Sequence, residues 1–203
     1  MKSSDSQFTT TRVEAFSDGV LAIAITLLVL EIRVPHLESP ADVPATLSAL
    51  LALSPKLAGF LLSFLFIAVF WVNHHRFFGL IRRVDAGLLW LNNLLLFLLC
   101  FIPFPTAFMG DYPNNPVTIG LFALVLVLAG LAFNGMWRHA LTHRLYEEHV
   151  APEMVQGALR RGLVGPAAYA AAGLLALAWP PAAWVIFLLV PLYYALPSGR
   201  RTN

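Results

Sequence analysis

Long apolar runs alternate with short polar segments along most of this chain. Each run has about the length that a helix needs to cross the roughly 30 Å hydrocarbon core of a bilayer. The runs cover approximately residues 13–32, 45–70, 86–108, 117–137, 163–179 and 182–196, and the last two are the shortest. Trp179-Pro180-Pro181 separates these two and predicts a tight helical hairpin. The pattern predicts an all-α integral membrane protein with six transmembrane helices per subunit.

Charged residues stand at the start of the first run. Arg12, Glu14 and Asp18 precede or enter it, and the predominantly apolar stretch begins at Val20. A carboxylate that faces lipid below the membrane surface costs about 3 kcal/mol or more, so Asp18 is expected to face protein or water. The first helix is therefore expected to pack against copies of itself rather than against lipid.

The composition excludes a soluble protein. Of the 203 residues, 59% are hydrophobic and 12% are charged, and a soluble chain of this length has too little interior for so much apolar surface. A single cysteine, Cys100, excludes an internal disulfide. The first run contains Asp18 and continues too far for a cleavable signal, so it is interpreted as a retained span. We expect one membrane domain over residues 1–203.

The basic residues predict the orientation of the chain. If the N-terminus is cytoplasmic, most of them fall in inner segments, namely Lys2, Arg12, Arg76, Arg82, Arg83, Arg138, Arg144, Arg160, Arg161, Arg200 and Arg201. Only Arg33 and Lys56 then fall outside. The positive-inside rule predicts a multi-pass protein of the cell (inner) membrane with both termini in the cytoplasm.

The first helix carries one apolar stripe. Ile23, Leu27 and Leu30 fall at i, i+4 and i+7, and Thr26 lies on the adjoining edge. Such a stripe is typical of an ordinary contact between helices. It also fits a pore in which rings of Ile and Leu, with a ring of hydroxyls between them, gate conduction by dewetting. The stripe alone leaves both interpretations open.

Polar side chains on three of the predicted helices share one depth. Trp71, His74 and His75 end the second helix, and Asn92 and Asn93 lie near the start of the third. Paired histidines suit metal binding or proton transfer, because imidazole titrates near neutral pH. The interpretation favoured here is that they satisfy the buried polar groups of the first helix. We expect one polar network of Arg12, Asp18, Trp71, His74 or His75, and Asn93.

Sites for enzymatic chemistry are scarce in this sequence. His139, His143 and Glu147 have a spacing that allows a shared metal ion. Cations interleave with them, so a solvated helix extension with Arg and Glu pairs is favoured instead. The sequence has no phosphate-binding glycine loop, nucleophile elbow, zinc spacing or potassium filter motif. We expect neither an enzyme nor a bound metal or cofactor.

Two motifs resemble a known family. Arg12 with Phe16-Ser17-Asp18, followed by the stretch from Ala22 to Glu31, resembles the first-helix signature of the transmembrane protein 175 family. Trp71-Val72-Asn73-His74-His75 resembles the second-helix motif. The family contains potassium channels of endosomes and lysosomes in animals and shorter prokaryotic homologues. A single six-span unit is similar to the prokaryotic form.

The resemblance implies a moderately potassium-selective channel without a re-entrant filter. It implies a homotetramer in which four copies of the first helix line a central pore. The implied constriction is Ile23, Leu27 and Leu30, and the implied selectivity residues are Ile23 and Thr26. The residues implied to brace the pore helix against the second and third helices are Arg12, Phe16, Ser17, Asp18, Trp71, His74, His75 and Asn93.

Two other functions compete with a channel. A proton-coupled transporter would move its proton through Asp18 and a histidine of the second helix, but the paired interrupted helices typical of such transporters are missing. A membrane metalloenzyme would use His139, His143 and Glu147. The sequence favours the channel over both.

Overall fold

The computed structural model describes residues 9–38 and 41–195, and helices make up nearly all of their regular structure. The helices are α1 (Thr10–Leu27), η1 (Leu28–Glu31), α2 (Val43–Ala52), α3 (Ser54–Phe78), α4 (Ala86–Phe101), α5 (Pro103–Asp111), α6 (Pro116–His143), α7 (Pro152–Gly162), α8 (Val164–Leu175) and α9 (Pro180–Ala195). Four residues named in the sequence-based predictions lie outside the described residues, namely Lys2, Leu196, Arg200 and Arg201.

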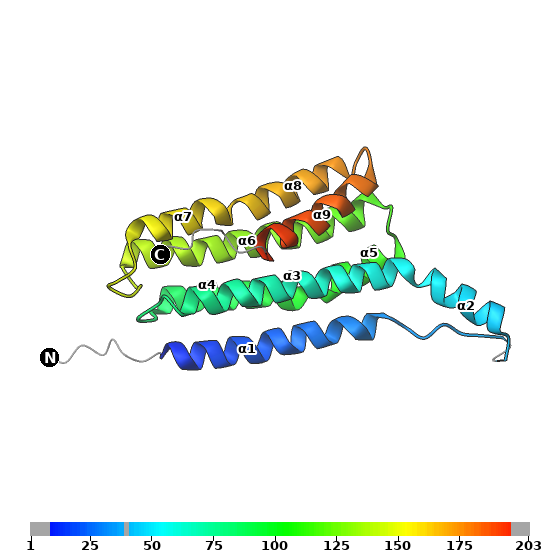
Figure 1. The fold of residues 1–203 in the computed structure, drawn as a ribbon, viewed down its shortest axis with the longest axis horizontal. Coiled ribbons are helices and arrows are strands. Elements are labelled where there is room, and N and C mark those ends of the chain that lie inside the picture. The colour runs from blue at the N-terminus through cyan, green and yellow to red at the C-terminus, as the bar shows by residue number, and fades with distance from the viewer. Residues whose placement is uncertain (1–8, 39–40, 196–203) are drawn as a thin grey trace, which may run out of the picture.

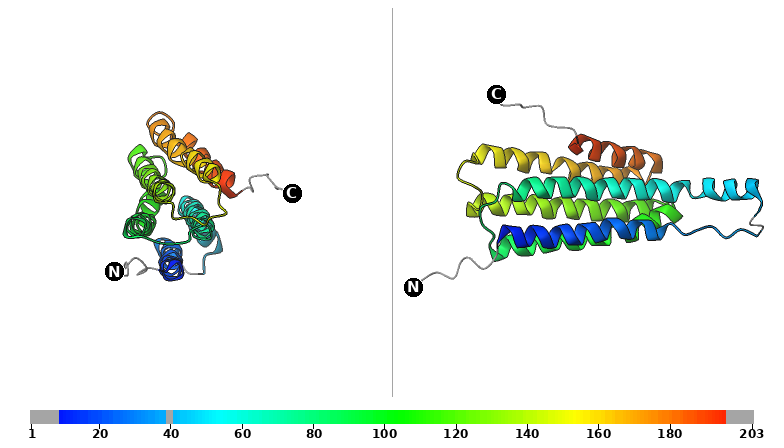
Figure 2. Two further views of the ribbon diagram at one scale, coloured as in Figure 1. Left: turned by 90° about the vertical axis from the view of Figure 1, so that its left-hand side faces the viewer. Right: turned by 60° about the horizontal axis from the view of Figure 1, so that its bottom comes forward.

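The helices lie side by side along one long axis (Figure 1). α1 lies along one edge and contacts α3 and α4, whereas α6 separates α4 from α8. Viewed down the axis, α1 remains at the periphery of the bundle (Figure 2). α2 extends beyond the other helices and buries none of its residues. The first helix therefore leaves a large part of its circumference uncovered by its own chain.

Prolines divide two of the predicted runs. The run at 45–70 forms α2 and α3, and the run at 86–108 forms α4 and α5, with Pro55 and Pro103 in the first turn of the second piece of each. Proline lacks the backbone N–H for an intrahelical bond but fits the first helical turn. Two helices also continue beyond their predicted ends, α3 to Phe78 and α6 to His143. The predicted ends were placed where the apolar pattern stops, at the membrane surface. The helices themselves continue further, because polar residues form the same backbone hydrogen bonds.

Within residues 9–38 and 41–195, four helical segments are long and apolar enough to cross a membrane: Thr10–Glu31, Ser54–Phe78, Ala86–Asp111 and Pro116–His143. The helices at the last two predicted spans are shorter. α8 has 12 residues and α9 has 16. At about 1.5 Å per residue neither reaches about 30 Å, so their crossing of the membrane stays a prediction.

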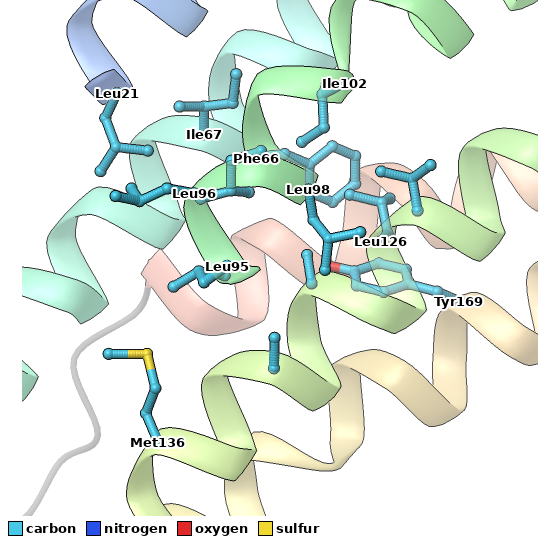
Figure 3. Packing of buried hydrophobic residues seen from close by; sticks show 14 of the residues in the cluster. Leu21, Phe66, Ile67, Leu95, Leu96, Leu98, Ile102, Leu126, Met136 and Tyr169 are labelled. Carbon is cyan, nitrogen blue, oxygen red and sulfur yellow. The ribbon is translucent and has the colours of Figure 1, made fainter. Parts of the chain in front are cut away.

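An aromatic cluster joins α3, α6, α8 and α9 at the centre of the bundle. The ring of Phe66 lies 5.8 Å from that of Phe122 and 5.5 Å from that of Tyr169, measured between centroids. Phe187 completes the cluster at 5.1 Å from Phe122. Leu95, Leu96 and Leu98 of α4 extend the core (Figure 3). Tilted and edge-to-face ring pairs such as these add to the free energy of burying the rings.

Small residues allow α6 and α8 to approach closely. A Cβ on Gly130 would lie 2.6 Å from Cγ of Pro166, so only glycine fits there. On the α8 side, a Cβ on Gly173 would lie 3.1 Å from that of Ala123, so small residues within 165–178 also pack against α6, as is common in membrane helices.

Backbone hydrogen bonds join two loops at the end of the bundle where α4 begins. The Arg82 N–H donates to the Leu145 carbonyl at 2.9 Å, and the Glu147 N–H donates to the Leu80 carbonyl at 2.9 Å. Arg82 Nη1 also lies 2.6 Å from Oε1 of Glu148. The α3–α4 connection and the α6–α7 connection thus form one unit.

Candidate pore helix and its polar contacts

α1 has a buried face and an exposed face. Its buried residues, all on the side that contacts α3 and α4, are Val13, Ser17, Leu21, Ala24 and Leu28 of the following turn. The predicted stripe lies on another side. Ile23 is 60% exposed, Leu27 42% and Leu30 69%. Within one chain the stripe contacts no helix that covers it, so it is not an ordinary contact between helices of the same subunit.

The last turn of this segment is tighter than an α-helix. Leu28–Glu31 form a 3-10 turn, and Ile32 has extended backbone. A 3-10 turn rotates each residue by about 120° instead of about 100°, so Leu30 is displaced around the axis from its α-helical position. The Ile32 N–H donates the last bond of this turn, to the Val29 carbonyl at 3.1 Å, and the helix ends because the backbone of Ile32 is extended.

Thr26 is exposed beside the stripe. Its hydroxyl donates a hydrogen bond of 2.9 Å to the Ile23 carbonyl one turn earlier. This bond uses the hydroxyl proton and leaves the oxygen lone pairs free. The side chain therefore presents an oxygen acceptor, and not a donor, to its surroundings.

Three buried polar side chains join α1, α3 and α4. Asn92 Nδ2 donates to Ser17 Oγ at 3.0 Å, and Asn92 Oδ1 lies 2.8 Å from Nε2 of His74. The Ser17 hydroxyl donates to the Val13 carbonyl at 2.8 Å. An amide oxygen only accepts, so His74 carries its proton on Nε2. Each of these polar groups is satisfied, as burial in a membrane bundle requires.

The structure distinguishes the two candidate histidines and the two candidate amides. His74 is buried and reaches α1 through Asn92, whereas His75 is exposed and stacks on Trp71. The hydrogen-bonded amide is Asn92 and not the expected Asn93, which is half-buried. Neighbouring residues of a helix point about 100° apart, so only one faces α1. Asn92 shares its face with buried Leu88, Leu95 and Leu99, a periodicity that was available from the sequence.

Asp18 makes a separate contact. Trp71 Nε1 donates to its Oδ1 at 2.8 Å, and both residues are exposed in the single chain. Of the network expected around Asp18, the structure gives the hydrogen bond from Trp71, whereas His74 bonds Asn92 instead. The carboxylate therefore lies on a side of α1 that its own chain does not cover.

Arg12 and Phe16 differ from the expected bracing role. Both are exposed, and Phe16 is 59% exposed. On a helix of about 3.6 residues per turn they share the side of Ile23, because the spacings of four and seven residues bring residues back to one face. Within a single chain they lie on the same exposed face of α1 as the stripe, and not at the contact with α3 and α4.

An open cavity lies beside the end of the stripe. It has a volume of about 310 Å³ and is lined by Leu27, Leu30, Glu31, Cys100, Phe101, Pro103, Phe104 and Ala107. The cavity thus separates the end of α1 from the junction of α4 and α5. Its lining is mainly apolar, and it widens the uncovered surface next to Leu30.

The sequence is similar to that of known channels. A family model described as "Endosomal/lysosomal potassium channel TMEM175" matches residues 12–103. A potassium channel of Chamaesiphon minutus is 39% identical over 200 residues, which cover 95% of this chain and 97% of that protein. The chain belongs to the TMEM175 family. A potassium channel of Streptomyces collinus is 38% identical, with 90% of each chain covered.

Solved structures of the TMEM175 family agree with the fold. The crystal structure of a lysosomal potassium-selective channel TMEM175 homologue from Chamaesiphon minutus matches with a TM-score of 0.82 and covers 94% of this chain and 98% of that one. At 19% identity, the structure of the potassium channel MtTMEM175 matches with a TM-score of 0.64 and shows the shared fold alone. The names of these TMEM175 relatives are those of channels, as expected for a chain without enzymatic motifs.

Animal TMEM175 proteins carry a different functional name. The human relative, an endosomal/lysosomal proton channel, is 28% identical over 195 residues. These residues cover 88% of this chain but 36% of the human protein. The chain thus corresponds to about a third of that relative.

Proposed function

We propose that this chain forms a potassium channel in the cell membrane, a homotetramer in which four copies of α1 surround the pore. Its bacterial relatives in the TMEM175 family are named potassium channels and match nearly the whole chain. The observation that carries the proposal is the uncovered face of α1, which holds the stripe of Ile23, Leu27 and Leu30.

The polar content of α1 argues that lipid does not cover this helix. Arg12, Asp18 and Thr26 are all exposed in the single chain. The exposed side of α4 carries large apolar residues instead, among them Trp90, Leu94 and Phe97. A charged group at membrane depth normally faces the bundle interior or water. α4 therefore suits contact with lipid, whereas α1 suits contact with other subunits and with the ions.

In the tetramer, the stripe forms the narrow part of the pore. Narrow rings of Ile23, Leu27 and Leu30 exclude water and so block the passage of ions. When the rings widen, water enters the constriction and ions can pass, which is how an apolar constriction acts as a gate. Thr26 contributes a ring of hydroxyl oxygens whose protons are held by the Ile23 carbonyl. Potassium sheds its water more readily than sodium does. A few hydroxyl oxygens beside a narrow apolar ring therefore give a moderate preference for potassium over sodium.

The remaining polar contacts set the rotation of the pore helix. Ser17 faces Asn92 and His74 on one side, and Asp18 accepts from Trp71 on another. Arg12 and Phe16 lie on the pore-facing side or at the contact between subunits. We also propose that α8 and α9 cross the membrane as the last of six spans, with both termini cytoplasmic.

The proton-coupled transporter is the second candidate. The animal relatives are named proton channels, and Asp18 is exposed. A relay would need a path from Asp18 to a histidine. His74 instead bonds Asn92, Asp18 bonds Trp71, and His75 reaches Trp71 only through ring stacking, which carries no proton. These separate partners favour the channel.

Reconstitution in a planar bilayer tests the proposal. Purified protein under a potassium gradient should give unitary currents that reverse near the potassium equilibrium potential. A chloride gradient alone should leave the reversal potential unchanged, which provides the control for selectivity. Absence of current, or reversal at the chloride potential, would refute a potassium channel. Crosslinking in the same membranes should give a ladder that ends at four chains.

A further inference from the structure

Three side chains that are common metal ligands meet where α4 begins and α6 ends. Asp85, His139 and His143 each offer one ligand atom, and these atoms all lie within 4.8 Å of one another. The site lies away from the exposed stripe of α1 and plays no part in the proposed pore. Asp85 comes from the loop before α4, whereas both histidines come from one face of α6.

Asp85 is held in place by its own helix. Its Oδ1 accepts from the Leu88 N–H at 2.8 Å and so caps the N-terminus of α4. Burial raises the pKa of the carboxyl, but the bonds from Leu88 and His139 outweigh it and hold the pKa of Asp85 below its ordinary value. The bond from Leu88 also fixes the position of the carboxylate at the start of α4.

His139 lies directly against this carboxylate. Its Nε2 is 2.9 Å from both Oδ1 and Oδ2 of Asp85. Gly87 makes room for the ring, since a Cβ there would lie 2.5 Å from Cε1 and 2.8 Å from Nε2 of His139. The absence of a side chain at Gly87 thus determines where the His139 imidazole sits.

His143 is oriented with one nitrogen available. Its ring stacks on that of His139 with centroids 4.0 Å apart, and its Nδ1 lies 3.1 Å from the His139 carbonyl oxygen. The Thr142 hydroxyl also lies 3.0 Å from Nδ1, so the backbone and side chains of α6 engage Nδ1 and leave Nε2 for a ligand. A backbone carbonyl on the second ring nitrogen is the usual way in which a metal-binding histidine is fixed.

The charges around the three residues do not prevent cation binding. Arg82 is paired with Glu148 at 2.6 Å. Arg138 and Arg144, which flank the histidines in sequence, are exposed and free to extend into solvent. His143 is also exposed, so its ring can move toward Asp85. Ligand atoms on one tetrahedral zinc ion are about 3.4 Å apart for bonds of about 2.1 Å, a modest shift from the present separation.

We propose that Asp85, His139 and His143 form a binding site for a zinc-class divalent cation that joins α4 to α6. Two imidazoles and one carboxylate suit Zn²⁺, Co²⁺ or Ni²⁺ better than Mg²⁺ or Ca²⁺, which prefer oxygen ligands. Three protein ligands leave one coordination position for water. The metal site considered from the sequence combined His139 and His143 with Glu147, whereas the carboxylate grouped with these histidines in the structure is Asp85.

Calorimetric titration of the intact, tag-free, chelator-treated protein with Zn²⁺ tests this site. Wild-type protein should bind one Zn²⁺ per chain. His143→Gln should weaken binding by more than about tenfold, because it removes an exposed ligand without disturbing the Asp85–His139 pair. Gly87→Ala should also weaken binding by about tenfold, since it displaces the His139 ring while all three ligands remain.

His149→Gln is the matched control. His149 is an exposed histidine of the following loop and is outside the cluster, so its loss should leave zinc affinity unchanged. Elution as the same oligomer shows that each variant is folded. Two outcomes would overturn the proposal: no stoichiometric binding by the wild type, or equal affinities of His143→Gln and wild type. Equal weakening by His149→Gln would also overturn it, because binding would then depend on surface histidines in general.

Discussion

The indole Nε1 of Trp71 donates a hydrogen bond of 2.8 Å to Oδ1 of Asp18 and so joins α3 to the uncovered side of α1. The preceding residue, Ser17, is buried and accepts from Asn92 of α4 at 3.0 Å. Consecutive residues of a helix point about 100° apart, so these two bonds hold α1 from two directions. Rotation of α1 about its axis would break both. The orientation of the stripe that carries Ile23 is therefore fixed within each subunit.

Shortening Ile23 should widen the narrowest part of the pore. Ile23 is the stripe's only β-branched residue, and its stiff χ1 gives a well-defined ring. We expect Ile23→Ala and Ile23→Asn to raise leak conductance and to weaken discrimination between ions. Unitary currents under matched potassium gradients measure this. If both variants conduct as the parent does, the constriction lies at another ring.

Removing the Thr26 hydroxyl should reduce potassium preference. Thr26→Val keeps the shape of the side chain but removes the oxygen whose lone pairs face outward. The reversal potential in mixed potassium and sodium should shift toward that of a non-selective pore. Thr26→Ser, which keeps the oxygen, serves as the matched control. An unchanged reversal potential in Thr26→Val would exclude the hydroxyl from selectivity.

Neutralising Asp18 should affect assembly more than permeation. In Asp18→Asn the bond from Trp71 loses its charged acceptor, which typically lowers the free energy of unfolding by about 1 kcal/mol. We expect a lower tetramer yield or melting temperature, with ion selectivity close to that of the parent. Trp71→Phe removes the donor instead and should give a similar loss.

The proton-coupled transporter predicts the opposite result for the same variant. Under that hypothesis Asp18→Asn folds well but loses proton movement. Liposomes with a pH-sensitive dye measure this directly. A stable Asp18→Asn tetramer with sharply altered proton flux would favour the transporter over the channel.

The two adjacent amides of α4 should differ in their effect on stability. Asn92→Leu leaves Nε2 of His74 without its buried acceptor, which costs about 1–3 kcal/mol, whereas Ser17 loses the bond from Asn92 but keeps its bond to the Val13 carbonyl. Asn93→Leu changes a half-buried side chain outside this network and should have a much smaller effect. Melting temperatures of the detergent-solubilised proteins compare the two. Equal losses would show that the Ser17–Asn92–His74 contacts do not stabilise the protein.

The sequence by itself determined the features that depend on local pattern. The apolar runs predicted helices in the regions of α1, α3, α4 to α5, and α6, because the length of an apolar run and its periodicity are properties of one segment. The motif around Phe16-Ser17-Asp18 predicted membership of the family, which the relatives confirm. The stripe of Ile23, Leu27 and Leu30 was visible for the same reason, since residues four and seven positions apart share a face.

Tertiary structure decided which of several similar residues make contact. The sequence could not choose between Asn92 and Asn93 as the partner of α1, because that depends on how α4 is rotated when its leucines pack. It could not bring Asp85 to His139, which is 54 residues away on another helix. Nor could it show that Asp18 lies outside the core of its own subunit. These contacts follow from side-chain packing across helices, where about 100° of rotation exchanges one neighbour for the next.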